Sequence, residues 1–193
     1  MNLELFDSLS EEIVAAKIFR VTSVNMLPTK SQGWNFTWRS LYLKNKSAMF
    51  FALSLRASPD QIEGILMLEV HFNEMVYMPN TEISPQNIGS KGRYRNVAGC
   101  LLAYASSVSF THGQGAYHGY LTFTSKTELI ELYMNKYDAQ LAAGHNMYFN
   151  PETGKKLMKK YLDIDYNLNI RLSTISKMFI GVLVFKAIEQ NND

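Results

Sequence analysis

Four extended apolar segments follow one another in this sequence, with only a few residues between them. Turn-forming residues separate them, for example Ser58-Pro59-Asp60. A parallel pair of strands needs a crossover of a dozen or more residues, whereas neighbouring antiparallel strands are joined by short links. The block is therefore predicted to be an antiparallel meander. The expected strands are Ser40–Leu43, Ala48–Ala57, Gly64–Val70 and Met75–Glu82.

The pattern changes after the fourth segment. A polar, glycine-bearing stretch, Gln86–Asn96, leads into an apolar run at Val97–Phe110 that is predicted to be a helix, and Tyr120–Thr124 is predicted to be the next strand. A strand, helix, strand unit gives a parallel pair with a right-handed connection. The sequence thus predicts an α+β (mixed α/β) fold, with a central, mostly antiparallel sheet that holds one parallel strand pair and is flanked by helices.

Capping signals predict three further helices. Ser8 and Glu11 have capping-box spacing before an apolar run that reaches Val21, and Ser125 and Glu128 repeat the spacing. The remaining expected elements are a strand at Asn146–Phe149 and a helix opened by Asn150 and Pro151.

The length and the residue content narrow the class of protein. With 193 residues, the chain is expected to form one domain over 1–163 and a C-terminal extension over 164–193. The extension carries an apolar run at 175–188, so it is expected to pack on the domain or to form a subunit interface in a homodimer. A single cysteine, Cys100, excludes a disulfide scaffold and structural zinc, and no metal site is expected.

Neither export nor a membrane is indicated by the sequence. The N-terminus is acidic and has no basic region before an apolar stretch, so we expect no signal peptide. The longest strongly apolar run, Met178–Phe185, is far shorter than the roughly 20 residues that a membrane-spanning helix requires. The expected compartment is the cytoplasm.

The net charge of +2 gives no indication of a nucleic-acid partner. Two basic clusters nevertheless keep such a partner as a third, weaker hypothesis, which predicts affinity that falls steeply with salt. They are Lys91, Arg93 and Arg95, and the lysines 155, 156, 159 and 160.

The junction between the fourth strand and the following helix is the strongest candidate site. The first N–H groups of a helix are unpaired and the helix dipole adds positive potential, so together they bind phosphate-type anions. The alternative is that the glycines only form turns and the basic side chains are solvated. The residues predicted to bind the anion are Lys91, Gly92, Arg95, Asn96, Val97, Ala98 and Gly99, and the Arg93 side chain is expected to add positive charge beside them.

The order of the expected elements and several sequence motifs resemble the GNAT superfamily of acyl-CoA N-acyltransferases, and within it a divergent bacterial branch. The resemblance covers about four fifths of the chain. The stretches that carry it are Gly33–Trp38, Thr81–Asn87, Tyr94–Gly99, Ser125–Ile130 with Tyr133, and Gly144–Met147.

The resemblance implies where a cofactor would bind. The family signature, Arg/Gln-x-x-Gly-x-Gly/Ala, holds the pyrophosphate of coenzyme A with backbone amides, and it aligns with Arg95–Cys100. Ala98 stands at the first glycine position. In the family, the fourth strand splays from the fifth and its backbone meets the pantetheine arm, which corresponds here to Ile83 and Ser84. The Ile83 amide is the expected donor to the oxyanion.

The resemblance also implies an activity, which is the transfer of an acetyl group from acetyl-CoA, as co-substrate, to an amine acceptor by direct attack on the thioester. Glu82 is the candidate general base and Tyr133 the candidate acid that protonates the departing thiolate. The structural alternatives are a carboxylate paired with an arginine and a tyrosine packed in the core. The functional alternative is a degenerate GNAT fold that binds a partner protein or a CoA-type ligand without turnover.

Overall fold

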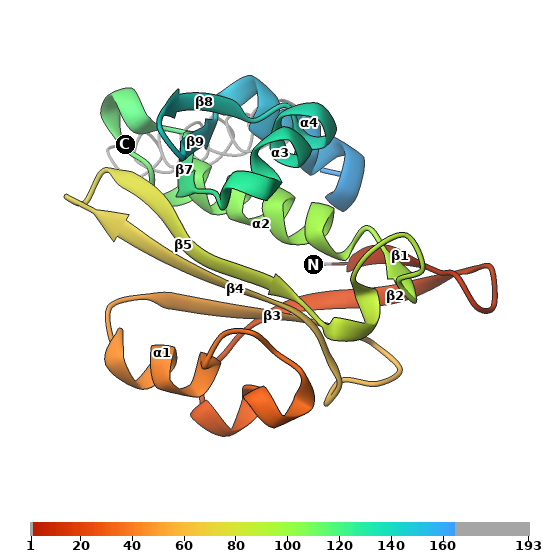
Figure 1. Cartoon of the computed structure of the whole chain (residues 1–193). Helices are drawn as coiled ribbons and strands as arrows, with labels where there is room; N and C mark the ends of the chain where they lie inside the picture. The colour runs from red at the N-terminus through yellow and green to blue at the C-terminus, as the bar shows by residue number, and fades with distance from the viewer. Residues whose placement is uncertain (1, 165–193) are drawn as a thin grey trace, which may run out of the picture. The chain divides into compact units, whose positions relative to one another are not determined.

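The computed structural model describes residues 2–164. Within them, nine strands form one sheet in the order β6-β1-β2-β3-β4-β5-β7-β9-β8, and every pairing is antiparallel except that of β5 with β7 (Figure 1). The strands are β1 (Asn2–Asp7), β2 (Glu12–Arg20), β3 (Met49–Leu55), β4 (Ile62–His71), β5 (Met75–Ile83), β6 (Tyr94–Arg95), β7 (Leu121–Thr124), β8 (Gln140–Ala143) and β9 (Asn146–Phe149).

Helices cover both faces of this sheet (Figure 1). On one face, α2 (Val97–His112) packs on β4 and β5 and against α4 (Pro151–Leu162), with α3 (Ile130–Tyr137) nearby. The other face carries α1 (Trp38–Lys44). The fold class expected from the sequence is therefore confirmed.

The meander and the crossover are confirmed as well. The strands β3, β4 and β5 pair antiparallel in succession, with Phe50 opposite Met67 and Ile65 opposite Glu82. After β5 the chain passes through α2 and returns as β7, which pairs parallel to β5. The long apolar segments led to the correct prediction here because their burial agrees with their local pattern.

The helix expected from Ser8 to Val21 is wrong, because this part of the chain is a β-hairpin. Its two strands, β1 and β2, pair with each other, and β2 also pairs with β3. Ala16 and Ile18 are buried while their neighbours are more exposed, which is the two-residue period of a strand. Glu11, expected at the third helical position, lies in the turn with φ of 58°.

The strand expected at Ser40–Leu43 is also wrong, because these residues belong to α1. Trp38 opens this helix and is fully buried. It belongs to a compact apolar cluster with Trp34, Phe50 and Met67. Burial of this large side chain against the sheet outweighs the strand preference of the residues that follow it.

The capping predictions have two outcomes. Asn150 does cap α4, since its side chain accepts a hydrogen bond of 2.9 Å from the Thr153 amide. Ser125 caps no helix, because its hydroxyl donates to the Lys126 carbonyl and α3 begins after a 3₁₀ turn at Thr127–Leu129. No local pattern in the sequence marked β8.

The predicted C-terminal extension lies, apart from Ile164, outside the described residues, and the boundary at 163/164 stays a prediction. Among residues 2–164, no helix has the length and apolarity to cross a bilayer.

Candidate functional site

The parallel strands β5 and β7 separate part of the way along their length. They pair only from Val76 to Met78 on β5, so the backbone beyond Met78 has no strand partner on that side within the described chain. A register shift between β4 and β5, opposite the end of this pairing, accompanies the separation. The separation exposes backbone groups that a sheet normally satisfies.

The direction of these backbone groups follows from one hydrogen bond. The Ser84 amide donates to the Glu63 carbonyl, 2.9 Å away, and therefore points toward β4. Because successive N–H groups of a strand alternate in direction, those of Thr81 and Ile83 point away from β4, to the open side. Two amide donors thus face the gap, whereas the Ser84 amide is engaged.

Two cavities follow one another along this open strand. The first, which we call the cleft, has a volume of about 200 Å³ and lies between β5 and β7. The second, which we call the loop cavity, has a volume of about 490 Å³ and lies beside the N-terminus of α2. Glu82 lines the cleft and Ile83 the loop cavity, so the two adjoin along β5.

The loop cavity contains most of the residues predicted to bind an anion. Asn96 precedes α2 with φ of 73° and has no side-chain capping bond. The first helical bond is that from the Cys100 amide to the Asn96 carbonyl, so the amides of the first turn, from Val97 to Gly99, are left without helical partners. The predicted residues that line this cavity are Ile83, Gly92, Arg95, Asn96, Val97 and Ala98.

Three of the predicted binding residues lie elsewhere. Lys91 and Ser84 do not line the loop cavity. Gly99 is absent from its wall too, and a Cβ atom placed on Gly99 would overlap the ring of Tyr161 on α4. The lack of a side chain at this position therefore serves the close packing of α2 on α4.

Glu82 lines the cleft, and its hydrogen-bond partners there are ones that the sequence did not predict. Oε1 accepts hydrogen bonds from the Asn35 amide (2.6 Å) and side chain (3.0 Å), and Oε2 accepts from the Phe36 amide (3.2 Å) and the Trp38 indole (2.8 Å). A carboxylate offers about four lone-pair positions, so all of them hold a donor. None of these four donors belongs to an arginine, which was the structural alternative expected for Glu82. The hydrogen bonds hold the segment before α1 against β5.

Tyr133 projects from α3 into the same cleft. Its ring contacts those of Phe123 and Tyr137, with centroids 4.9 Å and 6.1 Å away. Burial raises the pKa of the Tyr133 hydroxyl above its ordinary value, so this group stays protonated at neutral pH. Its hydroxyl has no hydrogen-bond partner among residues 2–164.

Sequence reasoning missed several residues of both cavities. Lys136 and Tyr137 line the loop cavity, and Lys126 lines the cleft. Lys136 follows Tyr133 by three positions, which is one helical turn, so a helix-face argument could have found it. Asn87 also lines the loop cavity; it ends the stretch Thr81–Asn87 that carries the family resemblance, but the sequence assigned it no role.

Neither a reactive cysteine nor a metal site is found among the described residues. Cys100 is buried, and burial raises the pKa of its thiol to about 12, so the nucleophilic thiolate is suppressed. Within the described part of the chain, no cluster of His, Cys, Asp or Glu side chains could hold a metal ion.

No protein-family model matches the sequence, and no curated protein matches it. Solved structures do match the fold. AtaTR bound with acetyl-CoA is 14% identical, with a TM-score of 0.53 over 74% of this chain and 98% of the other. A point mutant of the spermidine N-acetyltransferase SpeG from Vibrio cholerae is 12% identical, with a TM-score of 0.52 over 72% of this chain and 95% of the other.

The AtaT-AtaR complex bound to DNA gives a similar result, with 15% identity and a TM-score of 0.52. At these identities the likeness concerns the fold. The curled mixed sheet, its one parallel pair and the flanking helices are those of the GNAT acetyltransferases, whose resemblance to the sequence is thereby confirmed at the level of fold.

Proposed function

We propose that this protein is an N-acetyltransferase that moves an acetyl group from acetyl-CoA to an amine. The observation that carries the proposal is the opening of β5 away from β7, with an anion-type cavity at one end and a tyrosine-lined cleft at the other. A long thioester with a diphosphate at its far end could place the thioester in the cleft and the diphosphate in the loop cavity. The acetyl-CoA present in the AtaTR structure supports the same ligand class.

The loop cavity would receive the diphosphate. Free amides at the first turn of α2 and the dipole of this helix favour an anion. Arg95 and Lys136 add positive charge from two sides. Arg95 is held by a hydrogen bond of 3.2 Å from its Nε to the Ser8 hydroxyl, so its position does not depend on the ligand.

The two outward amides of β5 would then have separate roles. The Ile83 amide borders the loop cavity and would pair with the pantetheine arm. Thr81 lines the cleft together with Tyr133, so we assign the oxyanion donor to the Thr81 amide in place of that of Ile83. One preorganised donor of this kind lowers a barrier by about 3–4 kcal/mol.

The chemistry is a direct transfer. The amine nitrogen attacks the thioester carbonyl, the carbon–sulfur bond breaks, and the Tyr133 hydroxyl protonates the departing thiolate. Water in the cleft takes the surplus proton of the attacking nitrogen and returns a proton to the phenolate, so that amide and free thiol are the products. A raised tyrosine pKa suits this role, since the acid must carry its proton at working pH.

Glu82 was expected to be the base, and its contacts favour a different role. Its four hydrogen bonds leave no lone pair for the proton of the amine. We therefore assign Glu82 to positioning the wall of the cleft formed by Asn35 and Phe36, with water in the open cleft as the proton acceptor. The base role would require the carboxylate to exchange one of its donors for the amine or for water.

Binding of acetyl-CoA tests the first part of the proposal. At a concentration of 100 times the Kd, acetyl-CoA should stabilise the protein by about 2.7 kcal/mol. For a domain of this size, this raises the Tm by roughly 5–10 °C. AMP should give no comparable shift.

Ala98→Asp supplies a matched variant. A carboxylate at the second position of α2 should repel the diphosphate while it favours the helix, so the fold should be retained and the shift lost. Ala142→Asp, on the exposed strand β8, is the control and should keep the shift. An unchanged Tm for the wild type at millimolar acetyl-CoA would overturn the proposal.

Turnover separates the enzyme from a binding protein without activity. Release of the free CoA thiol in the presence of small amines, aminoacyl amines or lysine peptides would identify the acceptor class. Binding of acetyl-CoA without release for any of these acceptors would favour the degenerate GNAT-fold alternative. The homodimer remains a prediction that the molar mass in solution would test.

A further inference from the structure

Glu63 is a buried carboxylate that lies behind the wall of the loop cavity and does not line it. It projects from β4 and is fully inaccessible to solvent. Within the described chain it forms no ion pair. Moving a carboxylate out of water is costly unless hydrogen bonds compensate for the lost hydration.

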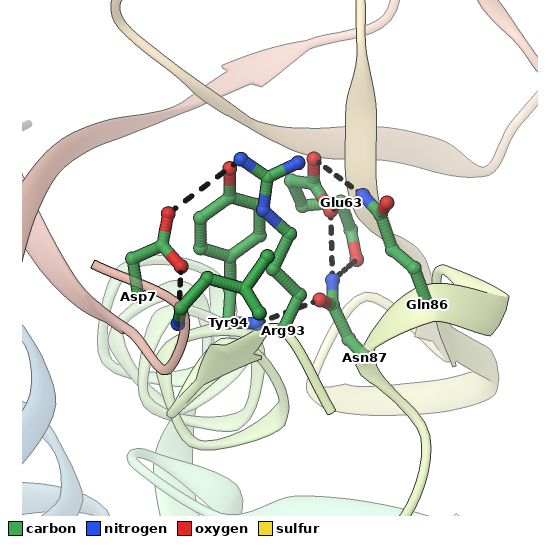
Figure 2. Close-up of polar contacts among 7 residues, drawn as sticks. Asp7, Glu63, Gln86, Asn87, Arg93 and Tyr94 are labelled. Atoms are coloured by element: carbon green, nitrogen blue, oxygen red, sulfur yellow. Dashed lines mark hydrogen bonds and ion pairs between the residues drawn. The ribbon is translucent and has the colours of Figure 1, made fainter. Parts of the chain in front are cut away.

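The compensation comes from two neighbouring residues of the loop between β5 and β6. The Gln86 side chain donates to Glu63 Oε1 and Oε2, at 3.0 Å and 2.8 Å, and the Asn87 side chain donates to Oε2 at 2.7 Å. The Asn87 side chain also reaches the Glu63 carbonyl at 3.3 Å. Figure 2 shows the carboxylate of Glu63 facing both amide side chains.

Asn87 transmits this contact to the far end of the loop. Its Oδ1 accepts a hydrogen bond of 3.0 Å from the Tyr94 amide, and the Arg93 amide donates to the Gln86 carbonyl at 2.9 Å. These bonds join the two ends of the loop, and the Glu63 carboxylate lies against the first of them. Gly92 completes the closure, since a Cβ atom there would lie 2.5 Å from the Asn87 carbonyl oxygen.

The N-terminal strand holds the exit of the loop from the other side. β6 pairs with β1, and the Arg93 guanidinium forms an ion pair with Asp7, whose nearest N and O atoms lie 3.6 Å apart (Figure 2). The same guanidinium lies over the Tyr94 ring, 4.8 Å from its centroid. The loop thus has fixed ends, and the contacts of Glu63 decide the conformation between them.

We propose that Glu63 is a positioning residue that orders residues 86–93 into the wall of the loop cavity before any ligand arrives. Opening of this loop would leave a buried charge without its donors, so the closed form is favoured. An ordered wall does not lose conformational entropy on binding, and this increases affinity for whatever the cavity holds. The inference rests on the proposed function for the identity of that ligand, which is the diphosphate of acetyl-CoA.

Glu63→Gln is the informative variant, because it keeps the shape and one acceptor but turns an N–H group toward the loop amides. Hydrogen exchange of the amides from 88 to 93 in the free protein should become faster. The Kd for acetyl-CoA should rise about 3–10-fold, the equivalent of one lost hydrogen bond. Glu69→Gln, in the same strand and away from the loop, is the matched control and should change neither readout.

A second ligand distinguishes positioning from general loss of stability. S-acetylpantetheine has the thioester arm without the diphosphate, so its Kd, from ligand-detected NMR titration, should be the same for wild type and Glu63→Gln. An equal loss of affinity for both ligands, or unchanged exchange in the loop, would overturn the proposal. If Glu63→Gln does not fold, Asn87→Ser removes the same contact from the loop and is judged by the same criteria.

The two levels of inference can fail separately. A wild-type protein that binds neither ligand would overturn the proposed function, and the exchange measurement alone would then decide whether Glu63 orders the loop. A wild-type protein that binds acetyl-CoA, with exchange in the loop unaffected by Glu63→Gln, would overturn the positioning role only.

Discussion

The Trp38 indole donates a hydrogen bond of 2.8 Å to the carboxylate of Glu82, which is 44 positions away in the sequence. This contact joins the start of α1 to the open part of β5. Through this contact, the charged side chain of Glu82 becomes part of the cleft wall, which an acceptor would meet. The indole is fully buried and the carboxylate only partly, so the bond also ties the core to the site.

Glu82→Gln should lower the free energy of unfolding by about 1–3 kcal/mol, because its N–H group would face two of the four donors and leave them unsatisfied. Urea unfolding measures this change. Trp38 and Trp34 are the two tryptophans, so the emission of the native state should change as well. Glu74→Gln, at an exposed site, should alter neither.

The pH profile of Glu82→Gln decides between the two roles of this residue. With a positioning role, kcat/KM falls mainly through the KM for the amine, and the shape of the acid limb stays that of the wild type. A lost acid limb, together with a turnover rate that drops by about 10²-fold or more, would show that Glu82 is the base.

Tyr133→Phe should slow turnover by about 10²–10⁴-fold, since it removes only the hydroxyl that would protonate the thiolate. The Kd for acetyl-CoA and the Tm should be unchanged, because the ring contacts with Phe123 and Tyr137 remain. Tyr104→Phe on α2 is the control for loss of a partly buried tyrosine hydroxyl. Turnover of Tyr133→Phe at the wild-type rate would exclude tyrosine as the acid.

The wild-type activity should not decline through ionisation of Tyr133 until the pH exceeds the usual tyrosine range of about 10. The reason is that burial raises the pKa of this hydroxyl, and the acid works only while protonated. A decline in turnover centred at about pH 8 that disappears in Tyr133→Phe would show that this hydroxyl loses its proton too early to be the acid. Such a profile would contradict the assignment of Tyr133.

Gly99→Ala should destabilise the protein by about 1–3 kcal/mol through overpacking against Tyr161. A gain in helix propensity of up to about 1 kcal/mol opposes this and does not cancel it. Gly154→Ala, at the same contact between α2 and α4, places its Cβ 3.3 Å from Ser106 Cβ and should cost less. Urea unfolding of both variants provides the test, and a Gly99→Ala protein at least as stable as the wild type would refute the packing role.

Stability should fall at alkaline pH. Burial raises the pKa of the Cys100 thiol to about 12 and raises that of Tyr137, so folding favours their protonated forms. The unfolded chain releases these protons at lower pH, from about 8.5 for cysteine and 10 for tyrosine. Their contribution is therefore fully present below about pH 8 and is lost as the pH rises toward the folded-state values.

Urea midpoints between about pH 7 and 10.5 would measure this loss, since the window spans the unfolded-state values of both groups. Cys100→Ala should reduce the slope above about pH 8.5, by up to about 1.4 kcal/mol per pH unit for a single group. An identical slope for Cys100→Ala and wild type would mean that the thiol has no part in it.

The long apolar segments determined most of the fold in advance. The three strands of the meander and α2 are recognisable because each has enough consecutive apolar residues for local pattern and burial to agree. Residues 8–21 and 40–43 were predicted wrongly because their apolar spacing fits both a helix and a strand. Only pairing with β3 and the burial of Trp38 selected the observed structure.

The sequence by itself marked the strand-to-helix junction as the candidate anion site, because glycines, basic residues and a helix start are local signals. The resemblance to a family motif also singled out Tyr133 as the candidate acid, and this residue lines the cleft. Tertiary structure decided the partners. It engaged all four lone-pair positions of Glu82, buried Gly99 against Tyr161, and set Glu63 beneath a loop that begins 23 positions later with Gln86. Such contacts join residues far apart in the chain, and no local pattern of residues encodes them.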